Sequence, residues 1–347
     1  MWFHCRRARS GGMRSGHPLR RGARLGCSAL LVILLGIAWP SVGQADPATG
    51  LPVGKARGEV VLDGVRLAFH SYKPAIRAGA GVQSGAAGPL IVAFHGSDRQ
   101  TELVRDFLIP LADREHAIIV APLLDEERFP RWRYQWAGLL EPLLKDGKTI
   151  KVGRKTRHRL RDAQEWTAGI VLALVDHLRK REGRPDMPYY LVGHSAGAQF
   201  IGRLSAFTAH DARRIVLANP GSYLAPTRRR TFPYGFGGLP DDLNKDDALR
   251  RYLALPITIY VGTEDRRRKG LDKSPGAERQ GKSRYERGRE IFRLARETAA
   301  SKGWPFGWRL VEAPGVGHNS QDMYGAPTAL EALFGEAAPS GDQEVFR

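Results

Sequence analysis

A serine between two glycines stands where an apolar run meets a stretch of helical composition. The pentapeptide Gly193-His194-Ser195-Ala196-Gly197 follows the apolar residues 189–192 and opens the stretch 196–209. A sharp strand-to-helix turn would hold the serine hydroxyl exposed above a sheet, and it needs the flanking glycines because a side chain there would collide with the neighbouring helix and strand. The pattern predicts that Ser195 is a nucleophile. The alternative is a glycine-rich helix start capped by a serine.

A nucleophilic serine needs a base, and after this kind of turn the acid and then the histidine follow in the chain. Only His210 and His318 lie beyond Ser195. His210 would stand some fifteen residues along the same helix, roughly 22 Å away at 1.5 Å per residue, which excludes it. His318 lies in the loop 315–319, after the expected strand 308–311, and is the predicted base. A surface-loop histidine is the alternative interpretation.

An acidic residue should orient His318 and stabilise its charged form. Asp265 follows the apolar strand 257–261, within the segment Gly262-Thr263-Glu264-Asp265. The tight turn at Gly262 favours Asp265, while Glu264 and Asp272 remain alternatives. Asp265 could instead be a surface partner of the arginines at 266–268.

Two backbone amides are expected to form an oxyanion hole. His95-Gly96-Ser97 ends the buried run 90–94, which should lie beside the strand before Ser195. In this architecture one amide comes from that loop and the other from the residue after the serine. We assign the N–H groups of Ser97 and Ala196, and expect His95 to have a structural role.

The elements that must position these groups alternate between strand and helix. Apolar strands are expected at 90–94, 117–121, 189–192, 215–218, 257–261 and 308–311, and helices at 101–114, 160–181, 196–209, 285–300 and 328–334. A hairpin at 59–62 and 65–72, around Asp63-Gly64, opens the series. This alternation predicts an α/β fold, a mostly parallel, doubly wound sheet with helices on both faces.

The first 45 residues have the composition of a secretory signal peptide. Seven arginines precede an apolar run at 29–39 and a small-residue stretch at 43–45. Eleven apolar residues are too few to span a bilayer, although an uncleaved anchor is the alternative. The predicted organisation is a signal peptide at 1–45, a flexible lead-in at 46–58, one hydrolase domain at 59–335 and a disordered tail at 336–347. Cys5 and Cys27 fall within the signal.

The composition is that of an ordinary globular protein with an excess of positive charge. Of its 347 residues, 42% are hydrophobic and 26% charged, and the net charge is +18. Basic clusters at 145–161, 228–230 and 266–289 all follow expected strands, so they suggest an anionic substrate or surface. A solvated, arginine-rich surface is the alternative. No nucleic-acid recognition motif is present.

With these motifs the chain resembles the α/β-hydrolase superfamily over residues 59–335. Within it, the segments 90–97 and 193–197 and the export signal resemble secreted bacterial esterases of the polyhydroxybutyrate depolymerase and feruloyl esterase type. The resemblance implies hydrolysis of carboxylic esters through an acyl-enzyme on Ser195. The absence of cysteines after the signal and of a polymer-binding domain departs from some depolymerases.

We therefore expect an exported serine esterase, periplasmic or secreted, that needs no metal or organic cofactor. Its expected partner is a small or polymeric ester, with no nucleic acid and no stable membrane anchor after signal cleavage. An amidase, a peptidase or a polyester depolymerase on the same fold is the alternative. A basic binding protein for anionic polymers is the alternative from a different class.

Overall fold

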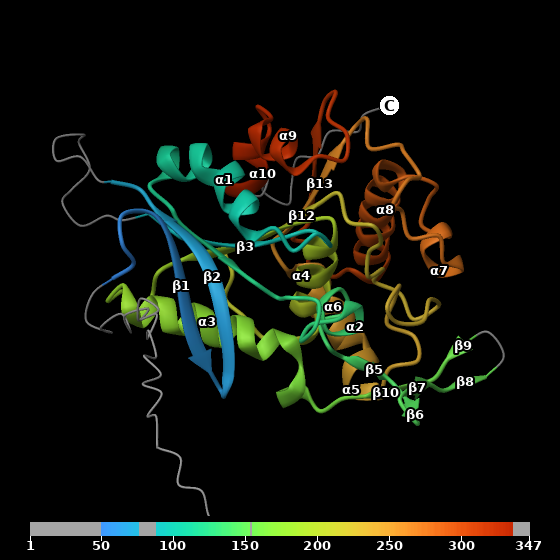
Figure 1. The fold of residues 1–347 in the computed structure, drawn as a ribbon. Helices are drawn as coiled ribbons and strands as arrows, with labels where there is room; N and C mark the ends of the chain where they lie inside the picture. Colours follow the sequence, from blue (N-terminus) through green and yellow to red (C-terminus); the bar gives the residue numbers. More distant parts are fainter. Residues whose placement is uncertain (1–49, 76–87, 153–154, 336–347) are drawn as a thin grey trace, which may run out of the picture. The chain divides into compact units, whose positions relative to one another are not determined.

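A mostly parallel sheet of eight strands forms the centre of the fold, which confirms the predicted α/β class (Figure 1). The computed structural model describes residues 50–75, 88–152 and 155–335. The strands, in their order across the sheet, are β1 (Gly54–Leu62), β2 (Val65–Lys73), β4 (Ile118–Pro122), β3 (Leu90–Phe94), β11 (Tyr189–His194), β12 (Arg214–Ala218), β13 (Ile257–Gly262) and β14 (Arg309–Ala313). From β4 to β14 neighbouring strands are parallel, so their carboxyl ends share one edge.

The predicted hairpin is confirmed, but its first strand is longer than expected. Asp63 and Gly64 both have positive φ, 48° and 77°, as a two-residue turn between right-twisted strands requires. β1 begins at Gly54, because residues 54–58 pair with residues 69–73 of β2. The predicted lead-in at 46–58 therefore contains part of the sheet. The predicted signal peptide at 1–45 and tail at 336–347 lie outside the described residues.

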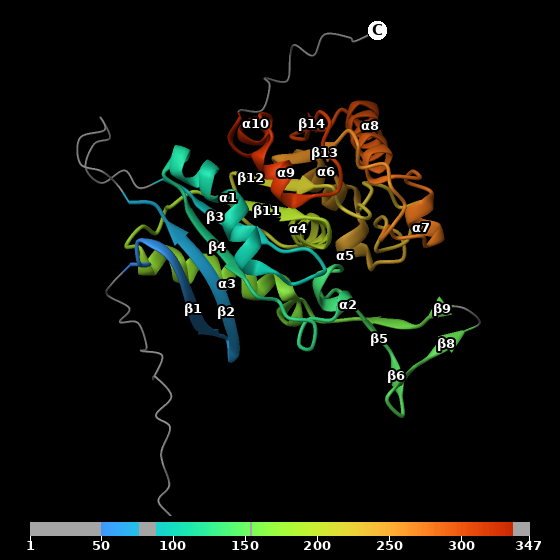
Figure 2. The same ribbon diagram turned by 45° about the horizontal axis from the view of Figure 1, so that its top comes forward.

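Helices cover both faces of the sheet, as predicted (Figure 2). On one face α1 (Thr101–Glu115), α9 (Ser320–Gly325) and α10 (Ala329–Phe334) pack on Ile91, Val192 and Val216. On the other face lie α3 (Thr167–Arg181), α4 (Ala196–Phe207), α6 (Asp246–Ala254) and α8 (Arg284–Lys302). Each parallel strand is thus buried on both sides, which is why these strands are continuous apolar runs.

One expectation about a helix is wrong, and a further helix was not expected. The helix predicted from residue 160 begins at Thr167, because Leu160 pairs with Leu140 in a small sheet and residues 163–165 form a 3-10 turn. Helix α6 was not predicted, because its exposed face is rich in Asp and Arg. It buries Leu249, Tyr252 and Leu253 at helical spacing. Two further short helices, α5 (Asp241–Asn244) and α7 (Pro275–Glu278), follow β12 and β13.

The long excursion after β4 contains a short helix and a branched β-arm. Helix α2 (Arg131–Tyr134) precedes the pair β5 (Leu140–Pro142) and β10 (His158–Leu160). Between them are two small hairpins, β6 (Leu144–Lys145) with β7 (Lys148–Thr149), and β8 (Lys151–Val152) with β9 (Lys155–Thr156). Figures 1 and 2 both show the hairpins extending away from the main sheet.

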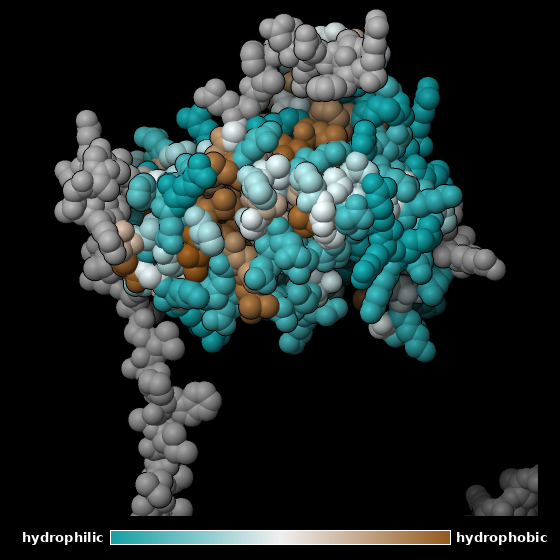
Figure 3. All heavy atoms as spheres, turned by 90° about the horizontal axis from the view of Figure 1, so that it is seen from above, coloured by the Kyte–Doolittle hydropathy of each residue, from teal (hydrophilic) through white to brown (hydrophobic). Residues whose placement is uncertain are grey.

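The surface seen from above is mostly hydrophilic, with hydrophobic residues gathered in a band across its centre (Figure 3). Within the described residues, every helix is too short or too polar to cross a membrane.

Candidate active site

Ser195 lies on a strained turn between β11 and α4, as the pentapeptide predicts. Its φ is 55° and its ψ is −110°, a conformation that non-glycine residues rarely adopt. A Cβ atom on Gly193 would lie 2.5 Å from the carbonyl carbon of Gly197, and one on Gly197 would lie 2.4 Å from the carbonyl oxygen of Phe94. The two glycines therefore allow the strand, the turn and the helix to pack at this distance.

The structure brings Ser195, His318 and Asp265 into one chain of hydrogen bonds. His318 Nε2 lies 3.2 Å from Ser195 Oγ, and His318 Nδ1 lies 2.7 Å from Asp265 Oδ2. The carboxylate accepts a hydrogen bond from Nδ1–H, which leaves Nε2 free to accept a hydrogen bond from the serine hydroxyl. The Asp265 side chain is fully buried, whereas 28% of the His318 side chain is exposed.

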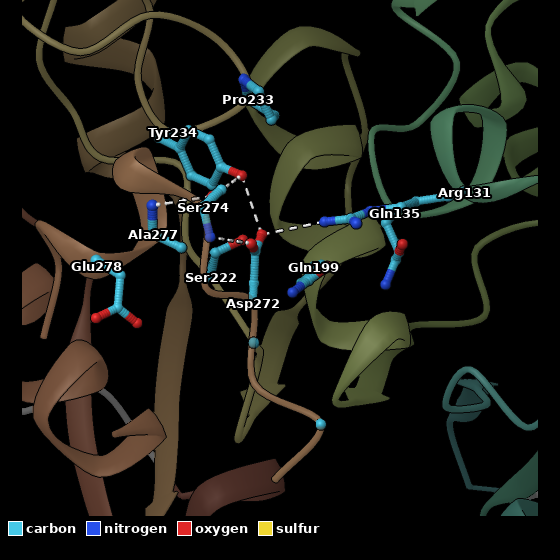
Figure 4. Close-up of polar contacts among 12 residues, drawn as sticks. Arg131, Gln135, Gln199, Ser222, Pro233, Tyr234, Asp272, Ser274, Ala277 and Glu278 are labelled. Carbon is cyan, nitrogen blue, oxygen red and sulfur yellow. Dashed lines mark hydrogen bonds and ion pairs between the residues drawn. The ribbon is translucent and has the colours of Figure 1, made fainter. Parts of the chain in front are cut away.

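The two other candidate acids lie elsewhere. The Glu264 side chain is exposed to solvent. Asp272 accepts hydrogen bonds from the Tyr234 hydroxyl and the Ser274 N–H, and it pairs with Arg131 of α2 at 3.1 Å (Figure 4). Asp272 thus ties α2 to the loop after β13 and makes no contact with His318.

Sequence reasoning missed the buried cation beside Asp265. Arg284 Nη1 lies 3.5 Å from Asp265 Oδ1, and both side chains are at most 3% exposed. Arg284 Nη2 also donates to the carbonyl oxygen of Gly270. The arginine is the first residue of α8 and is one of many in a basic segment, so no sequence pattern singles it out. It compensates the charge that Asp265 would otherwise bury alone.

Asn219, at the carboxyl end of β12, was also missed. Its Oδ1 accepts a hydrogen bond from the Gly262 N–H at 2.9 Å, and its Nδ2 donates to the carbonyl oxygen of Gly317 at 3.3 Å. These two loops carry Asp265 and His318. Asn219 is fully buried and has φ 45°, a conformation that asparagine tolerates better than most residues.

His95 holds the loop that carries Ser97. Its Nε2 accepts a hydrogen bond from the Leu124 N–H, and its Nδ1 donates to the carbonyl oxygen of Gly96 at 2.8 Å. Burial lowers the pKa of His95 to about 4, so the ring is neutral, as this pattern requires. In a trans peptide the Ser97 N–H points opposite to the Gly96 carbonyl, and hence away from His95. The expected structural role of His95 agrees with these contacts.

The second predicted amide belongs to Ala196, the first residue of α4. The N–H groups of a first helical turn have no acceptor within the helix, so this one is available to a ligand. The positive end of the helix dipole also favours a negative charge there.

A second imidazole lies against His318. The rings of His194 and His318 are 4.6 Å apart between centroids, with planes tilted by 33°. Burial, together with the charge of His318, holds the pKa of His194 well below its usual value. His194 therefore stays neutral beside the ring that would carry the proton.

A cavity of about 330 Å³ opens over Ser195 and His318. Its wall combines the loop after β3, the start of α1 and the loop before α9. The lining residues are Gly96, Ser97, Asp98, Gln100, Leu103, Val104, Phe107, His194, Ser195, His318, Asn319 and Ser320. A larger groove of about 1,120 Å³ runs along α8, but none of the residues predicted for catalysis lines it.

The described part of the chain contains no group of three His, Cys, Asp or Glu residues placed to hold a metal ion. The chemistry that the geometry offers is proton transfer and nucleophilic attack by side chains.

Comparisons with known proteins agree with this architecture. The poly(3-hydroxybutyrate) depolymerase LpqC from Bordetella parapertussis is 31% identical, with a TM-score of 0.68, and the match covers 83% of this chain and 93% of that one. Poly(aspartic acid) hydrolase-1 from Sphingomonas sp. KT-1 is 26% identical, with a TM-score of 0.66, and the match covers 79% and 96%. No protein-family model and no curated protein matches the chain. The chain is a hydrolase that belongs to the α/β-hydrolase superfamily, in the group of the poly(3-hydroxybutyrate) depolymerases and related esterases.

Proposed function

We propose that this protein is an exported serine hydrolase that cleaves carboxylic esters through an acyl-enzyme on Ser195. The observation that carries the proposal is the hydrogen-bonded sequence Ser195–His318–Asp265 beneath an open cavity. The group to which the chain belongs supports ester hydrolysis. The signal-like first 45 residues support export to the periplasm or the medium.

In the first half of the reaction Ser195 Oγ attacks the carbonyl carbon of the ester. His318 Nε2 takes the serine proton, and Asp265 stabilises the imidazolium that forms. The carbonyl oxygen becomes an oxyanion, which the N–H groups of Ser97 and Ala196 stabilise. Removal of one such donor typically costs about 10²- to 10³-fold in rate. The C–O bond of the ester then breaks, and His318 gives its proton to the departing alcohol.

In the second half water replaces the alcohol. His318 takes a proton from the water, whose oxygen attacks the acyl carbon. The tetrahedral intermediate collapses, the bond to Ser195 Oγ breaks, and the serine recovers its proton from His318. The product is the free acid. Only side chains and backbone amides of this chain take part, so the mechanism requires no cofactor.

Amide hydrolysis of an anionic polymer is a second candidate. One similar structure is named a poly(aspartic acid) hydrolase, and this chain carries basic clusters that suit an anionic substrate. The same serine, base and acid can cleave an amide once His318 protonates the departing nitrogen. The preference between ester and amide depends on how the acyl and leaving groups fit the cavity.

The proposal is tested by labelling with a fluorophosphonate probe and by turnover of matched nitrophenyl esters and nitroanilides. We expect wild type to be labelled and to prefer esters of a definite acyl length. Ser195→Ala should lose both labelling and turnover, while Ser320→Ala, on the wall of the same cavity, should retain both. Unchanged turnover in Ser195→Ala would reject this nucleophile, and faster turnover of the anilides would favour the amidase.

A further inference from the structure

The branched β-arm, residues 143–152 and 155–159, is built around a closed ring of three backbone hydrogen bonds. The N–H of Leu143 donates to the carbonyl of Arg157, that of Arg157 to Ile150, and that of Ile150 to Leu143, at 2.8–2.9 Å. The ring joins the base of the arm, β5 with β10, to its two hairpins. The arm therefore has a defined fold even though little of it is buried.

Four cations on this arm are exposed and have no ion-pair partner within the described part of the chain. Lys145, Lys148, Lys151 and Arg157 are all exposed and form no ion pair with any other described residue. By contrast, Arg159 at the base pairs with Glu141 at 2.6 Å. The hairpins thus present positive charge that the described protein does not neutralise.

The β6–β7 hairpin places two of these charges directly opposite each other. Lys145 pairs with Lys148 across the two strands, and like charges at such positions are destabilising. Between them, Asp146 and Gly147 have positive φ, 52° and 72°, so the aspartate meets the conformational demand of the turn. The arrangement works against the stability of the hairpin, which is expected of a surface that serves binding.

The arm also differs from the rest of the chain in its kind of charge. Four of the chain's twelve lysines fall within residues 145–155, although arginine is far more common in the whole sequence. A general bias toward arginine therefore does not explain the cluster. Lysine is a hydrated point charge on a flexible stem and suits diffuse attraction, whereas arginine suits planar, bidentate contacts.

The segment that leads into the arm leaves the sheet at the carboxyl ends of its parallel strands, where the candidate site also lies. It follows β4, whose carboxyl end lies beside that of β3. Tyr134 of α2, just before the arm, donates a hydrogen bond to the carbonyl oxygen of His95 at 2.6 Å. A polymer held by the arm would thus be attached to the segment that packs behind the loop of Ser97.

We propose that the arm binds linear polycarboxylates through Lys145, Lys148, Lys151 and Arg157. Residues 143–159 include no Phe, Tyr or Trp on which nucleic-acid bases could stack, and the ring of His158 packs against Trp136. Among the described residues of the hairpins, Leu144 is the only large hydrophobic side chain that is exposed. One such side chain is too little for insertion into a lipid surface. The carboxylates of a flexible polymer can pair with these separated positive groups, three ammonium groups and one guanidinium. Pairing also reduces the repulsion between the groups. This binding does not depend on the proposed catalytic mechanism.

The test measures binding of fluorescein-labelled polyacrylate to the full chain by fluorescence anisotropy across a range of salt concentrations. Polyacrylate has neither ester nor amide in its backbone, so its binding is independent of hydrolysis. The arm variant is K145Q/K148Q/K151Q/R157Q. The matched control is R213Q/R250Q/R251Q/R296Q, which removes four exposed cations outside the arm that form no ion pair with a described residue. The variant K145R/K148R/K151R/R157K keeps the charge of the arm.

We expect the arm variant to bind polyacrylate at least about ten-fold more weakly. The slope of the logarithm of the binding constant against the logarithm of the salt concentration should also become shallower by about three, since each lost charge contact contributes about 0.7–0.9. The affinity of the control and of the charge-preserving variant for polyacrylate should stay within about three-fold of wild type. Salt screens the attraction of charges that do not contact the polymer. Turnover of nitrophenyl acetate and thermal unfolding should match wild type in all three.

Equal weakening in the arm variant and in the control would overturn the proposal, because net charge would then account for binding. Loss of binding in the charge-preserving variant would also overturn it. So would tighter binding of wild type to single-stranded DNA or to phosphatidylglycerol vesicles than to polyacrylate at equal salt.

Discussion

Asn219 donates a hydrogen bond from Nδ2 to the carbonyl oxygen of Gly317, the residue before His318. The same side chain accepts a hydrogen bond from Gly262, three residues before Asp265. One buried amide at the end of β12 thus connects the loops that carry Asp265 and His318. The distance between His318 and Asp265 depends on both connections.

Asn219→Asp should lower kcat by about 10- to 100-fold, since misplacement of a catalytic group by about 1 Å can cost that much. The carboxylate can still accept from the Gly262 N–H, but it cannot donate to the Gly317 carbonyl and repels it. Turnover of a nitrophenyl ester separates the effects on kcat and KM, and KM should change little. Asn219→Asp with wild-type kcat would show that the two loops hold their positions without this residue.

Asp265→Asn should lower kcat by about 10⁴-fold, because an amide cannot hold the imidazole in the required tautomer and does not stabilise its charged form. Glu264→Gln is the matched control in the same loop, and its exposed side chain predicts nearly full activity. Asp272→Asn should weaken the contact with Arg131 and lower the melting temperature, while kcat should change little. A large loss of kcat in Glu264→Gln and little in Asp265→Asn would reverse the assignment of the acid.

Gly197→Ala should reduce both stability and activity. The new methyl group would lie 2.4 Å from the Phe94 carbonyl oxygen and 2.8 Å from that of His95, so the helix or the loop must move. We expect a cost of about 1–3 kcal/mol in the free energy of unfolding, as for other overpacked sites. Activity should fall further than folding explains, since the displaced loop carries Ser97. Gly169→Ala, where nothing lies within 4 Å, is the matched control for urea unfolding and turnover.

Acid should destabilise the protein through His95. Its pKa is about 4 in the folded state and 6.5 in the reference state, so between these values the unfolded chain binds more protons. The free energy of unfolding is therefore highest above pH 6.5 and falls as the pH drops toward 4, by about 3 kcal/mol for this residue. His194, whose pKa is also lowered by burial, acts in the same direction.

The variant His95→Gln does not titrate in this range and isolates the contribution of the one residue. Urea unfolding at several pH values from 7.5 to 4 should show a shallower pH dependence in the variant than in wild type. Parallel curves for the two proteins would contradict the assignment of this acid sensitivity to His95.

Local sequence patterns predicted the buried strands, the elbow at Ser195 and the histidine, His318, that lies beside it. Runs such as residues 90–94 and 257–261 are apolar on both faces, and this is sufficient to predict strands covered by helices. Element boundaries differed from the prediction where polar residues are structured by distant partners. The start of β1 depends on pairing with β2, and the start of α3 depends on the pairing of Leu160 with Leu140.

The turn at Gly262 favoured Asp265 over Glu264 and Asp272, but only the tertiary structure shows its hydrogen bond to His318 and reveals Asn219 and Arg284 beside the site. These residues act across separations in the chain of 19 to 98 residues. A short sequence window records which side chains can occupy a turn, because sterics and backbone conformation act locally. The direction in which a carboxylate or an amide points is decided by strands that meet only when the sheet assembles, and so it emerges only from the folded chain.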